Sequence, residues 1–405
     1  MQPMLSPYPA NRRPRILQCV THLALGGAER VALTLMTALR EEFDFSVYAI
    51  RGLGDGEVGR DLERELSTLN IPLRAGPAVP MRFGGMISGG IGLKRAVDFF
   101  GPDLIHLHTE IPEASYATMT VLRPARRAIP LVRTIHNAVI WDFWRSLGRW
   151  CDRRMPETFA AGVSQGAVDA FLKLRRESGA GDPPIPPRVI YNGVPPVNYS
   201  ARRPRSPTDP VRIVFGGRFE PQKGTDLLPQ ILAQVRMPRD RRVHLVLFGS
   251  GLHEILLRSL GSQPPPNWTI EVCRPVSDFR MRLADFDLAI VPSRFEGIAL
   301  VAIEAFLANL PVIATDAAGL REALPPEYPW RARAGDVESF AAMLTEALAN
   351  PNRWEEIAGM GRAFARKRFD VSPMAGGYRA LYLRALESHT SASRPAREVG
   401  VPSSP

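Results

Sequence analysis

Two positively charged side chains bracket a short turn in the second half of this 405-residue sequence. Arg218 and Lys223 lie in the segment GGRFEPQKG, directly after a predicted strand at 211–216. Two cations fixed at the end of a strand can neutralise a diphosphate, although they can also be ordinary solvated charges. Four of the 51 basic residues are lysines, so a bias toward arginine does not explain Lys223. We therefore interpret the pair as a candidate diphosphate site.

Paired glycines precede the first predicted helix. Gly26 and Gly27 follow a predicted strand at 15–21 and open a predicted helix at 28–39. Glycines at such a junction let backbone amides approach a phosphate closely, and the helix N-terminus adds the positive end of its dipole. The alternative interpretation is a tight turn without a ligand.

Two glutamates stand eight positions apart in the segment SRFEGIALVAIE, across a predicted junction between a strand and a helix. If the helix begins near Ile298, Glu296 precedes it and Glu304 lies about two turns into it. One carboxylate could then bind a sugar hydroxyl and the other a ribose. The alternative is a pair of surface glutamates on a helix that serves packing.

A histidine ends the predicted strand at 131–136. Side chains at the carboxyl ends of parallel strands face the crevice in which α/β sheets bind ligands. His136 is therefore a candidate site residue, with a buried core histidine as the alternative.

Two further groups resemble metal ligands. Asp285 and Asp287 immediately precede a predicted apolar strand at 288–292, which is typical of an ordinary strand entry. His106 and His108 stand two positions apart in a predicted strand, so both side chains point to the same face of the sheet. The sequence places no third ligand nearby. We expect no metal and no other cofactor.

Short apolar runs alternate with amphipathic stretches along the chain, as parallel strands and crossover helices do. They predict two α/β sheets, one in each half. The predicted strands lie at 15–21, 45–50, 104–108, 131–136, 159–163 and 188–191, and then at 211–216, 243–249, 268–272, 288–292 and 311–315.

The segment between the two predicted sheets is rich in proline and lacks hydrophobic periodicity, which is typical of a linker. We predict an N-terminal domain at 1–195, a linker at 196–210 and a C-terminal domain at 211–372. A helix at 373–387 is expected to cross back to the N-terminal domain, and a polar tail at 388–405 is expected to be disordered.

The formal net charge of +10 favours anionic partners without naming one. The three cysteines have neither paired spacing nor an even count, which fits a reducing compartment. No apolar run approaches the ~18 residues of a membrane-spanning helix. We therefore expect a cytoplasmic protein, either soluble or peripheral on the inner face of the cell membrane.

Positive charge is concentrated at 123–154, where eight arginines face two acids. Helical winding of 141–155 places apolar residues on one face and arginines on another. These two faces predict an interfacial helix on anionic lipid, with packing on the domain's own core as the alternative. The apolar face comprises Trp141, Trp144, Leu147, Cys151 and Met155, and the basic face Arg145, Arg149 and Arg153.

Taken together, the motifs resemble glycosyltransferase family 4, the retaining group with the GT-B fold, and in particular its bacterial GGAER-type enzymes of polysaccharide and lipid-linked glycan synthesis. The resemblance covers roughly 15–386 and departs from the family at Arg274 and Ala318, where glycines are usual. It rests on GGAER at 26–30, VS at 163–164, YNGV at 191–194, GR and KG at 217–224, the Glu296/Glu304 pair and PVIATD at 311–316.

The resemblance implies two Rossmann-like domains facing across a cleft. It implies metal-independent transfer, with retention, of a hexose or N-acetylhexosamine from a nucleotide-diphosphate sugar. The acceptor would be a saccharide or a polyprenyl-diphosphate-linked glycan in envelope or exopolysaccharide synthesis.

The resemblance also implies a role for each candidate residue. Arg218 and Lys223, with the amides of Gly26 and Gly27, would hold the diphosphate, and Glu304 would hold the ribose. His136 would approach the sugar from the first domain and act with Glu296, Arg218 and Lys223 in catalysis. The rest of the donor site would be Val276 and the backbone of Gly297, Ile298, Ala299 and Leu300.

Two other classes of protein remain open at this point. A non-hydrolysing sugar-nucleotide epimerase has the same two-domain architecture and would form product without an acceptor. A noncatalytic basic protein would bind nucleic acid in a salt-sensitive way. Neither explains both glutamates together with Arg218 and Lys223, so we expect no nucleic-acid partner.

Overall fold

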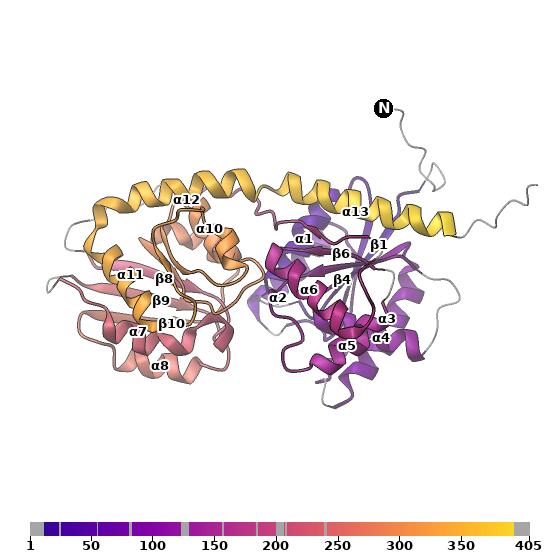
Figure 1. Ribbon diagram of the computed structural model, residues 1–405, viewed down its shortest axis with the longest axis horizontal. Helices are drawn as coiled ribbons and strands as arrows, with labels where there is room; N and C mark the ends of the chain where they lie inside the picture. Colours follow the sequence, from indigo (N-terminus) through magenta and orange to yellow (C-terminus); the bar gives the residue numbers. More distant parts are fainter. Residues whose placement is uncertain are drawn as a thin grey trace, which may run out of the picture.

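The computed structural model describes residues 12–392, apart from 24–25, 55, 81–82, 123–128, 156–157, 184, 200–205, 207–208 and 239–240. The described chain forms two α/β halves side by side, with two long C-terminal helices running along one side of both (Figure 1). This arrangement confirms the predicted GT-B architecture of two Rossmann-like domains.

The N-terminal half contains, within the described ranges, a seven-stranded parallel sheet in the order β3-β2-β1-β4-β5-β6-β7. The strands are β1 Arg15–Val20, β2 Asp44–Ala49, β3 Leu73–Ala75, β4 Leu104–His108, β5 Leu131–Ile135, β6 Thr158–Gly162 and β7 Arg188–Val189. The helices are α1 Gly27–Leu39, α2 Glu57–Thr68, α3 Gly85–Phe100, α4 Glu110–Leu122, α5 Arg145–Arg153 and α6 Gln165–Ser178.

The C-terminal half contains, in its described part, a six-stranded parallel sheet in the order β10-β9-β8-β11-β12-β13. The strands are β8 Val211–Gly216, β9 Val243–Phe248, β10 Trp268–Cys273, β11 Leu288–Val291, β12 Val312–Thr315 and β13 Arg331–Ala332. The helices are α7 Leu228–Gln234, α8 Glu254–Ser262, α9 Phe279–Arg282, α10 Leu300–Leu307 and α11 Val337–Ala349.

Each predicted strand is present, and two short edge strands were missed. β3 has three residues and β13 has two, so neither carries enough alternation to signal a strand. The predicted helix at 28–39 begins one residue earlier, at Gly27.

The C-terminal helices are α12 Trp354–Arg368 and α13 Val371–Ala392, and α13 crosses back onto the N-terminal half (Figure 1). Tyr378 and Tyr382 of α13 are fully buried there. The helix is longer at both ends than the predicted 373–387. The structure continues α13 through 388–392, which had been expected to belong to a disordered tail, and the sequence has no glycine or proline between Tyr378 and Pro395 that would end the helix there. The remainder, 393–405, lies outside the described residues.

No helix within the described ranges has both the length and the apolar content needed to span a bilayer.

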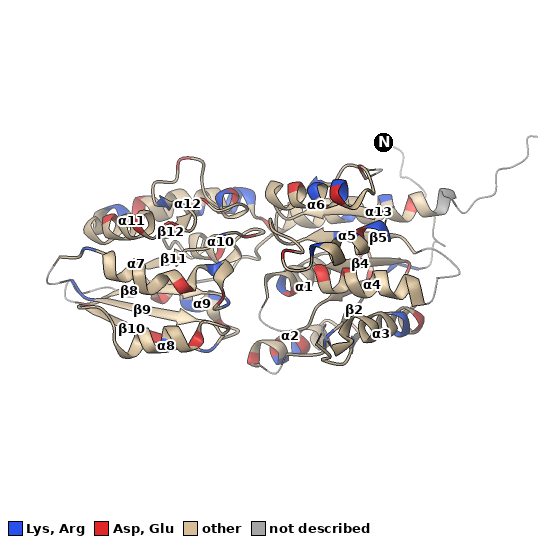
Figure 2. Ribbon diagram, turned by 60° about the horizontal axis from the view of Figure 1, so that its bottom comes forward, with Lys and Arg blue, Asp and Glu red and all other residues tan. Residues whose placement is uncertain are grey.

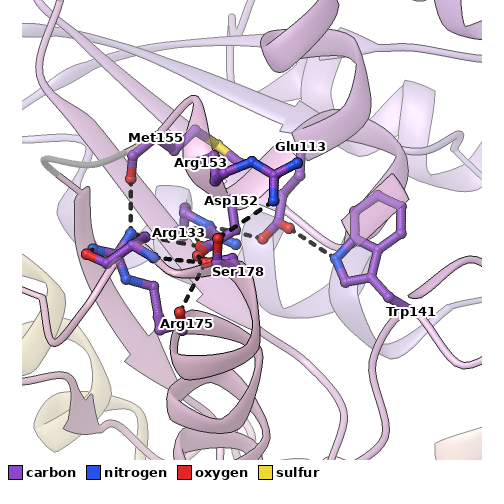
Figure 3. Close-up of polar contacts among 9 residues, drawn as sticks. Glu113, Arg133, Trp141, Asp152, Arg153, Met155, Arg175 and Ser178 are labelled. Atoms are coloured by element: carbon purple, nitrogen blue, oxygen red, sulfur yellow. Dashed lines mark hydrogen bonds and ion pairs between the residues drawn. The ribbon is translucent and has the colours of Figure 1, made fainter. Parts of the chain in front are cut away.

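A buried ion cluster ties four elements of the N-terminal half together (Figure 3). Arg133 of β5 is fully buried and donates from Nε to Glu113 of α4 at 2.9 Å and from Nη1 to Asp152 of α5 at 2.9 Å. Asp152 also accepts from Ser178 of α6 at 2.7 Å, and Arg175 Nη1 lies 3.6 Å from its Oδ1. The carboxylate of Asp152 is therefore shared by two buried guanidinium groups.

This cluster explains why the predicted interfacial face of 141–155 points inward. Trp141, Cys151 and Met155 are at most 5% exposed, and Trp141 donates from Nε1 to Glu113 at 3.3 Å. The interpretation of these residues as a lipid-facing surface was wrong, because the domain's own core covers them. Phe143 and Trp144, just before α5, are 93% and 45% exposed.

We predict that Asp152→Ala destabilises the N-terminal half by about 3–5 kcal/mol, because it leaves two buried arginines without their shared carboxylate. Thermal and urea unfolding would measure the loss. Asp142→Ala, an exposed acid of the same segment, is the control and should change stability by less than about 0.5 kcal/mol. Equal effects of the two substitutions would contradict the structural role of the cluster.

Candidate active site

A cavity of ≈ 670 Å³ lies between the two halves. Its walls come from segments that follow the carboxyl ends of strands in both sheets, including those after β1, β4, β5, β8 and β11. Charged residues on α1 and α9 lie where the two halves face each other (Figure 2). The convergence of strand ends from both sheets is the geometry in which open α/β sheets bind ligands.

Lys223 and Glu296 line this cavity and are paired with each other. The Lys223 Nζ atom donates to both carboxylate oxygens of Glu296, at 2.7 and 2.8 Å. Ser293 donates to the same carboxylate at 2.7 Å, and Glu296 is 4% exposed. An ammonium has three donors, so one N–H of Lys223 remains for an anion while Glu296 is held in place.

Arg218 reaches the cavity from the loop after β8 and is the more exposed of the two predicted cations. Its guanidinium contacts Glu220 at 2.8 Å and donates to Gln222 at 2.9 Å. These contacts hold the side chain on the same turn as Lys223, as the sequence predicted.

Gly26 and Gly27 also line the cavity, where α1 begins. A Cβ on Gly26 would lie 2.0 Å from Oε2 of Glu29, and a Cβ on Gly27 would lie 3.3 Å from the side chain of Leu300 in the other half. The carboxyl of Glu29 therefore folds back over the start of its own helix. Burial raises the pKa of Glu29 to about 7.

Glu304 lies in α10 and forms an ion pair with Arg280 of α9, whose Nε is 3.2 Å from Glu304 Oε1. Arg280 also donates to the backbone oxygen of Pro195 in the segment between the two sheets. Burial raises the pKa of Glu304 to about 7, although the charges of Arg280 and Arg30 lower it. Glu304 is thus placed in the cavity, as predicted, with a cationic partner that the sequence did not reveal.

The helix between the two glutamates begins about two residues later than predicted. α10 begins at Leu300, so Ile298 and Ala299 precede the helix. The cavity is lined by Gly297, Ile298 and Leu300 and, from the segment after β10, by Val276. Ala299 is 1% exposed and faces the core, so its side chain is not part of the cavity wall.

His136 lines the cavity from the N-terminal half, just after β5, as predicted. Its Nε2 atom lies 2.9 Å from Nδ1 of His108, and burial lowers the pKa of His136 to about 3. The side chain is therefore neutral at physiological pH.

The residues set aside as metal ligands do not line the cavity. Asp285 and Asp287 precede β11, at the opposite end of the strand from the cavity, and Asp287 accepts from the backbone N–H of Arg212 at 2.8 Å. His106 and His108 are buried in a hydrogen-bonded network. No group of three or more potential metal ligands occurs among the described residues.

Several cavity residues were missed by sequence reasoning. Thr109 and Glu110 follow β4 directly, so the strand-end rule that identified His136 could have found them. Thr109 has a φ of 73°, and Trp141 has a φ of 55°. Glu110 accepts from the backbone N–H of Trp141 at 2.8 Å, and burial raises its pKa. These residues form the wall on the N-terminal side. Glu29 lies within the GGAER motif at 26–30 but was given no role there, and Arg280 carries no comparable sequence signal.

The YNGV motif takes part in a contact between the two halves, together with Glu322 and the start of α6. Glu322 accepts from the backbone N–H groups of Gln165 and Gly166 at 2.9 and 3.2 Å, at the start of α6. Tyr191, from the YNGV segment, donates to the same carboxylate at 3.0 Å. Glu322 therefore joins the C-terminal half to the positive end of an N-terminal helix.

The raised pKa of Glu304 predicts a pH dependence of stability. The unfolded carboxyl ionises near pH 4.5 and the folded one at about 7, so the folded chain binds the extra proton between these values. Its stabilising effect is full below about pH 4.5 and is lost as pH rises through 7. Parent and Glu304→Gln should therefore diverge over this range, with the parent losing about 1–3 kcal/mol relative to the variant.

Chemical unfolding of both proteins from pH 4 to 8 measures this difference. Glu327→Gln, an exposed glutamate of the same half, is the control and should parallel the parent. A constant difference between parent and Glu304→Gln across the range would show that folding does not raise the pKa of Glu304.

The two halves match two family descriptions. Residues 25–197 match "Glycosyltransferase Family 4" and residues 210–350 match "Glycosyl transferases group 1". Among characterised proteins, the chain is 26% identical over 293 residues to MMP alpha-(1->4)-mannosyltransferase of Mycolicibacterium hassiacum, covering 66% of this chain and 68% of that protein. It is 27% identical over 320 residues to glycogen synthase of Mycobacterium tuberculosis, covering 74% and 73%.

Solved structures agree on the fold. HepE of Anabaena, in complex with UDP and glucose, superposes with a TM-score of 0.72 at 21% identity, covering 91% of this chain and 99% of that one. Sucrose-phosphate synthase of Thermosynechococcus elongatus superposes with a TM-score of 0.71 at 16% identity, covering 93% and 100%. With both domain families matched in order along one GT-B fold, the chain belongs to the glycosyltransferases, with a family 4 N-terminal domain and a group 1 C-terminal domain.

Proposed function

We propose that this protein is a retaining glycosyltransferase that moves a hexose or N-acetylhexosamine from a nucleotide-diphosphate sugar to a saccharide or lipid-linked acceptor. The observation that carries the proposal is the cavity wall, in which the Lys223–Glu296 pair, Arg218 and the start of α1 surround one space. The relatives named as a mannosyltransferase and a glycogen synthase, and the UDP and glucose bound to HepE, support a nucleotide-sugar donor.

The donor's diphosphate would be bound by Arg218, by the remaining N–H of Lys223 and by the first amides of α1 at Gly26 and Gly27. Positive side chains and a helix N-terminus both favour an anion at this position. The diphosphate would also face Glu29, whose raised pKa allows it to be neutral near pH 7. A protonated Glu29 would not repel the phosphates.

The sugar and the ribose would be bound by the two glutamates. Glu296 has its charge balanced by Lys223, and it can accept from a sugar hydroxyl beside the backbone of Gly297. Glu304, held by Arg280, would accept from the ribose, and Val276 would lie near the base. This assignment gives each carboxylate a separate part of the donor.

Departure of the nucleoside diphosphate creates negative charge, which is the main change that catalysis must stabilise. Arg218, Lys223 and the amides at the start of α1 would supply this stabilisation without a metal. Retention would follow if the leaving diphosphate stays beside an oxocarbenium-like sugar while the acceptor attacks from the same face.

The acceptor would enter beside Thr109, Glu110 and Trp141 on the N-terminal side. A relative in Corynebacterium glutamicum is named for transfer to a phosphatidylinositol monomannoside, which supports a lipid-linked acceptor. We propose a role in envelope or exopolysaccharide synthesis, on the cytoplasmic side of the membrane. An epimerase or a nucleic-acid scaffold receives no support from the family matches.

We predict that Lys223→Ala lowers turnover by about 10²-fold or more, the scale of losing one preorganised charge donor. Release of nucleoside diphosphate during sugar transfer would measure it. Lys173→Ala removes an exposed lysine of α6 that does not line the cavity, and it should leave turnover unchanged. Near-parental turnover of Lys223→Ala would refute the role, and inactivation of the parent by a chelator would contradict metal independence.

Peripheral attachment to anionic lipid is also part of the proposal, now supported by Phe143 and Trp144, whose side chains are exposed just before α5. Arginines near these aromatics would add up to ~1 kcal/mol each close to an anionic surface. We predict that the parent sediments with phosphatidylglycerol vesicles at low salt, and that Phe143→Ser/Trp144→Ser sediments less.

The matched control is Leu252→Ser/Ile255→Ser, which removes an exposed apolar pair, 76% and 85% exposed, from the C-terminal half. It should sediment as the parent does. If no protein sediments at low salt, or both double variants lose binding equally, attachment through Phe143 and Trp144 is refuted.

A further inference from the structure

A buried chain of hydrogen bonds connects the C-terminal helix α13 to His136 in the cavity. Tyr382 of α13 accepts from Gln18 Nε2 of β1 at 3.0 Å, and Gln18 Oε1 lies 2.7 Å from His108 Nε2 of β4. His108 Nδ1 in turn lies 2.9 Å from His136 Nε2. Gln18, His108 and Tyr382 are all 0% exposed, so water does not compete for these bonds.

The sheet topology brings these side chains together. β1, β4 and β5 are neighbours in the parallel sheet, so Gln18, His108 and His136 follow one another across adjacent strands. α13 lies over this part of the N-terminal half (Figure 1). A second bond fixes Tyr382, because its hydroxyl also lies 2.7 Å from Nδ1 of His106. The end of the chain therefore completes a network that begins at the cavity.

The direction of each hydrogen bond in this network follows from the side-chain amide of Gln18. The oxygen of Gln18 can accept and cannot donate, so the proton of His108 must be on Nε2. A neutral imidazole has one donor and one acceptor, and burial holds the pKa of His108 well below its usual value. Nδ1 of His108 is therefore an acceptor, and the proton of His136 must be on Nε2. The other nitrogen of His136, Nδ1, has no hydrogen bond among the described residues.

We infer that Gln18, His108 and Tyr382 are positioning residues that hold His136 in the neutral, Nε2-protonated tautomer, with Nδ1 as the hydrogen-bond acceptor for a substrate hydroxyl. The identity of that hydroxyl, on the donor sugar or the acceptor, rests on the proposed function. The assignment of the tautomer does not rest on the proposed function. A consequence is that the cavity histidine depends on the docking of α13, a helix that follows the second domain in sequence.

The direct test is NMR of the full chain labelled with ¹⁵N-histidine, in which long-range proton–nitrogen correlations identify the protonated nitrogen of each ring. His136→Gln assigns the signals of His136. We expect a single neutral Nε2–H tautomer for His136 in the parent at pH 6 to 8. A single Nδ1–H tautomer, or a mixture of the two, would overturn the inference.

Three variants separate positioning from folding. Tyr382→Phe and Gln18→Met should each give mixed tautomers at His136. Tyr378→Phe removes an equally buried hydroxyl from the same helix, bonded to Thr134 at 2.8 Å and not to Gln18, and should leave the tautomer intact. An unchanged His136 spectrum in both Tyr382→Phe and Gln18→Met would overturn the inference. Should one of these fold poorly, the other decides.

Turnover of UDP-glucose and GDP-mannose with a membrane-lipid extract gives the kinetic counterpart. His108→Leu should lower kcat by about 10- to 100-fold, the usual cost of losing an orienting partner, with little change in KM. In His108→Asn a side-chain oxygen can replace Nδ1, so most of kcat should return. Equal losses in the two variants would contradict positioning. A parent with the expected tautomer but no sugar transfer would refute the proposed function and leave the positioning inference standing.

Discussion

A close backbone contact between the two domains sets the geometry on which the rest of the site depends. At this point the backbone of Gly297 passes the carbonyl of His136 so closely that a Cβ on Gly297 would lie 1.8 Å from that oxygen. The backbone N–H of Ala138 donates to the carbonyl of Glu296 at 3.1 Å, beside the same contact. Gly319, at a φ of 77°, packs against the backbone of Glu296, because a Cβ on Gly319 would lie 2.2 Å from the Glu296 carbonyl oxygen. The glutamate and the histidine therefore face one cavity because two backbones touch.

The charges in the cavity are balanced in pairs rather than accumulated. Lys223 is matched to Glu296, Arg280 to Glu304 and Arg218 to Glu220. Two other carboxyls, Glu29 and Glu110, have pKa values raised by burial. An incoming diphosphate would meet cations already oriented by these carboxylates, so little reorganisation would accompany binding. The same pairing offsets the desolvation cost of burying these charges in the cavity.

Local sequence patterns were sufficient for the architecture and for most of the cavity residues. Apolar runs located each strand longer than three residues, and the rule of strand ends then placed Gly26, His136, Lys223 and Glu296 around one cavity between the two sheets. Contacts between distant segments could not be predicted this way. Lys223 and Glu296 are 73 positions apart, and Tyr382 is 364 positions from Gln18. Nothing in their local sequences identifies these partners.

The segment around α5 shows a second limit. Periodicity correctly separated an apolar face from a basic one, but it could not tell a protein core from a lipid surface, because both accept apolar side chains. Asp152, which was counted as one of two acids in a basic segment, is the centre of the buried cluster that turns this helix inward. A single carboxylate shared by two arginines from other elements decided the outcome, and its partners are 19 and 23 positions away in sequence.

The function proposed for the cavity is transfer of a sugar from a nucleotide-diphosphate donor to a separate acceptor. The most direct measurement is a screen of radiolabelled sugar nucleotides, incubated with the protein, a chelator and a membrane-lipid extract, followed by NMR of the product's anomeric centre. We predict that label moves from a donor to the extract with the anomeric configuration retained. Isomerisation of a sugar nucleotide without an acceptor, or transfer with inversion, would contradict it.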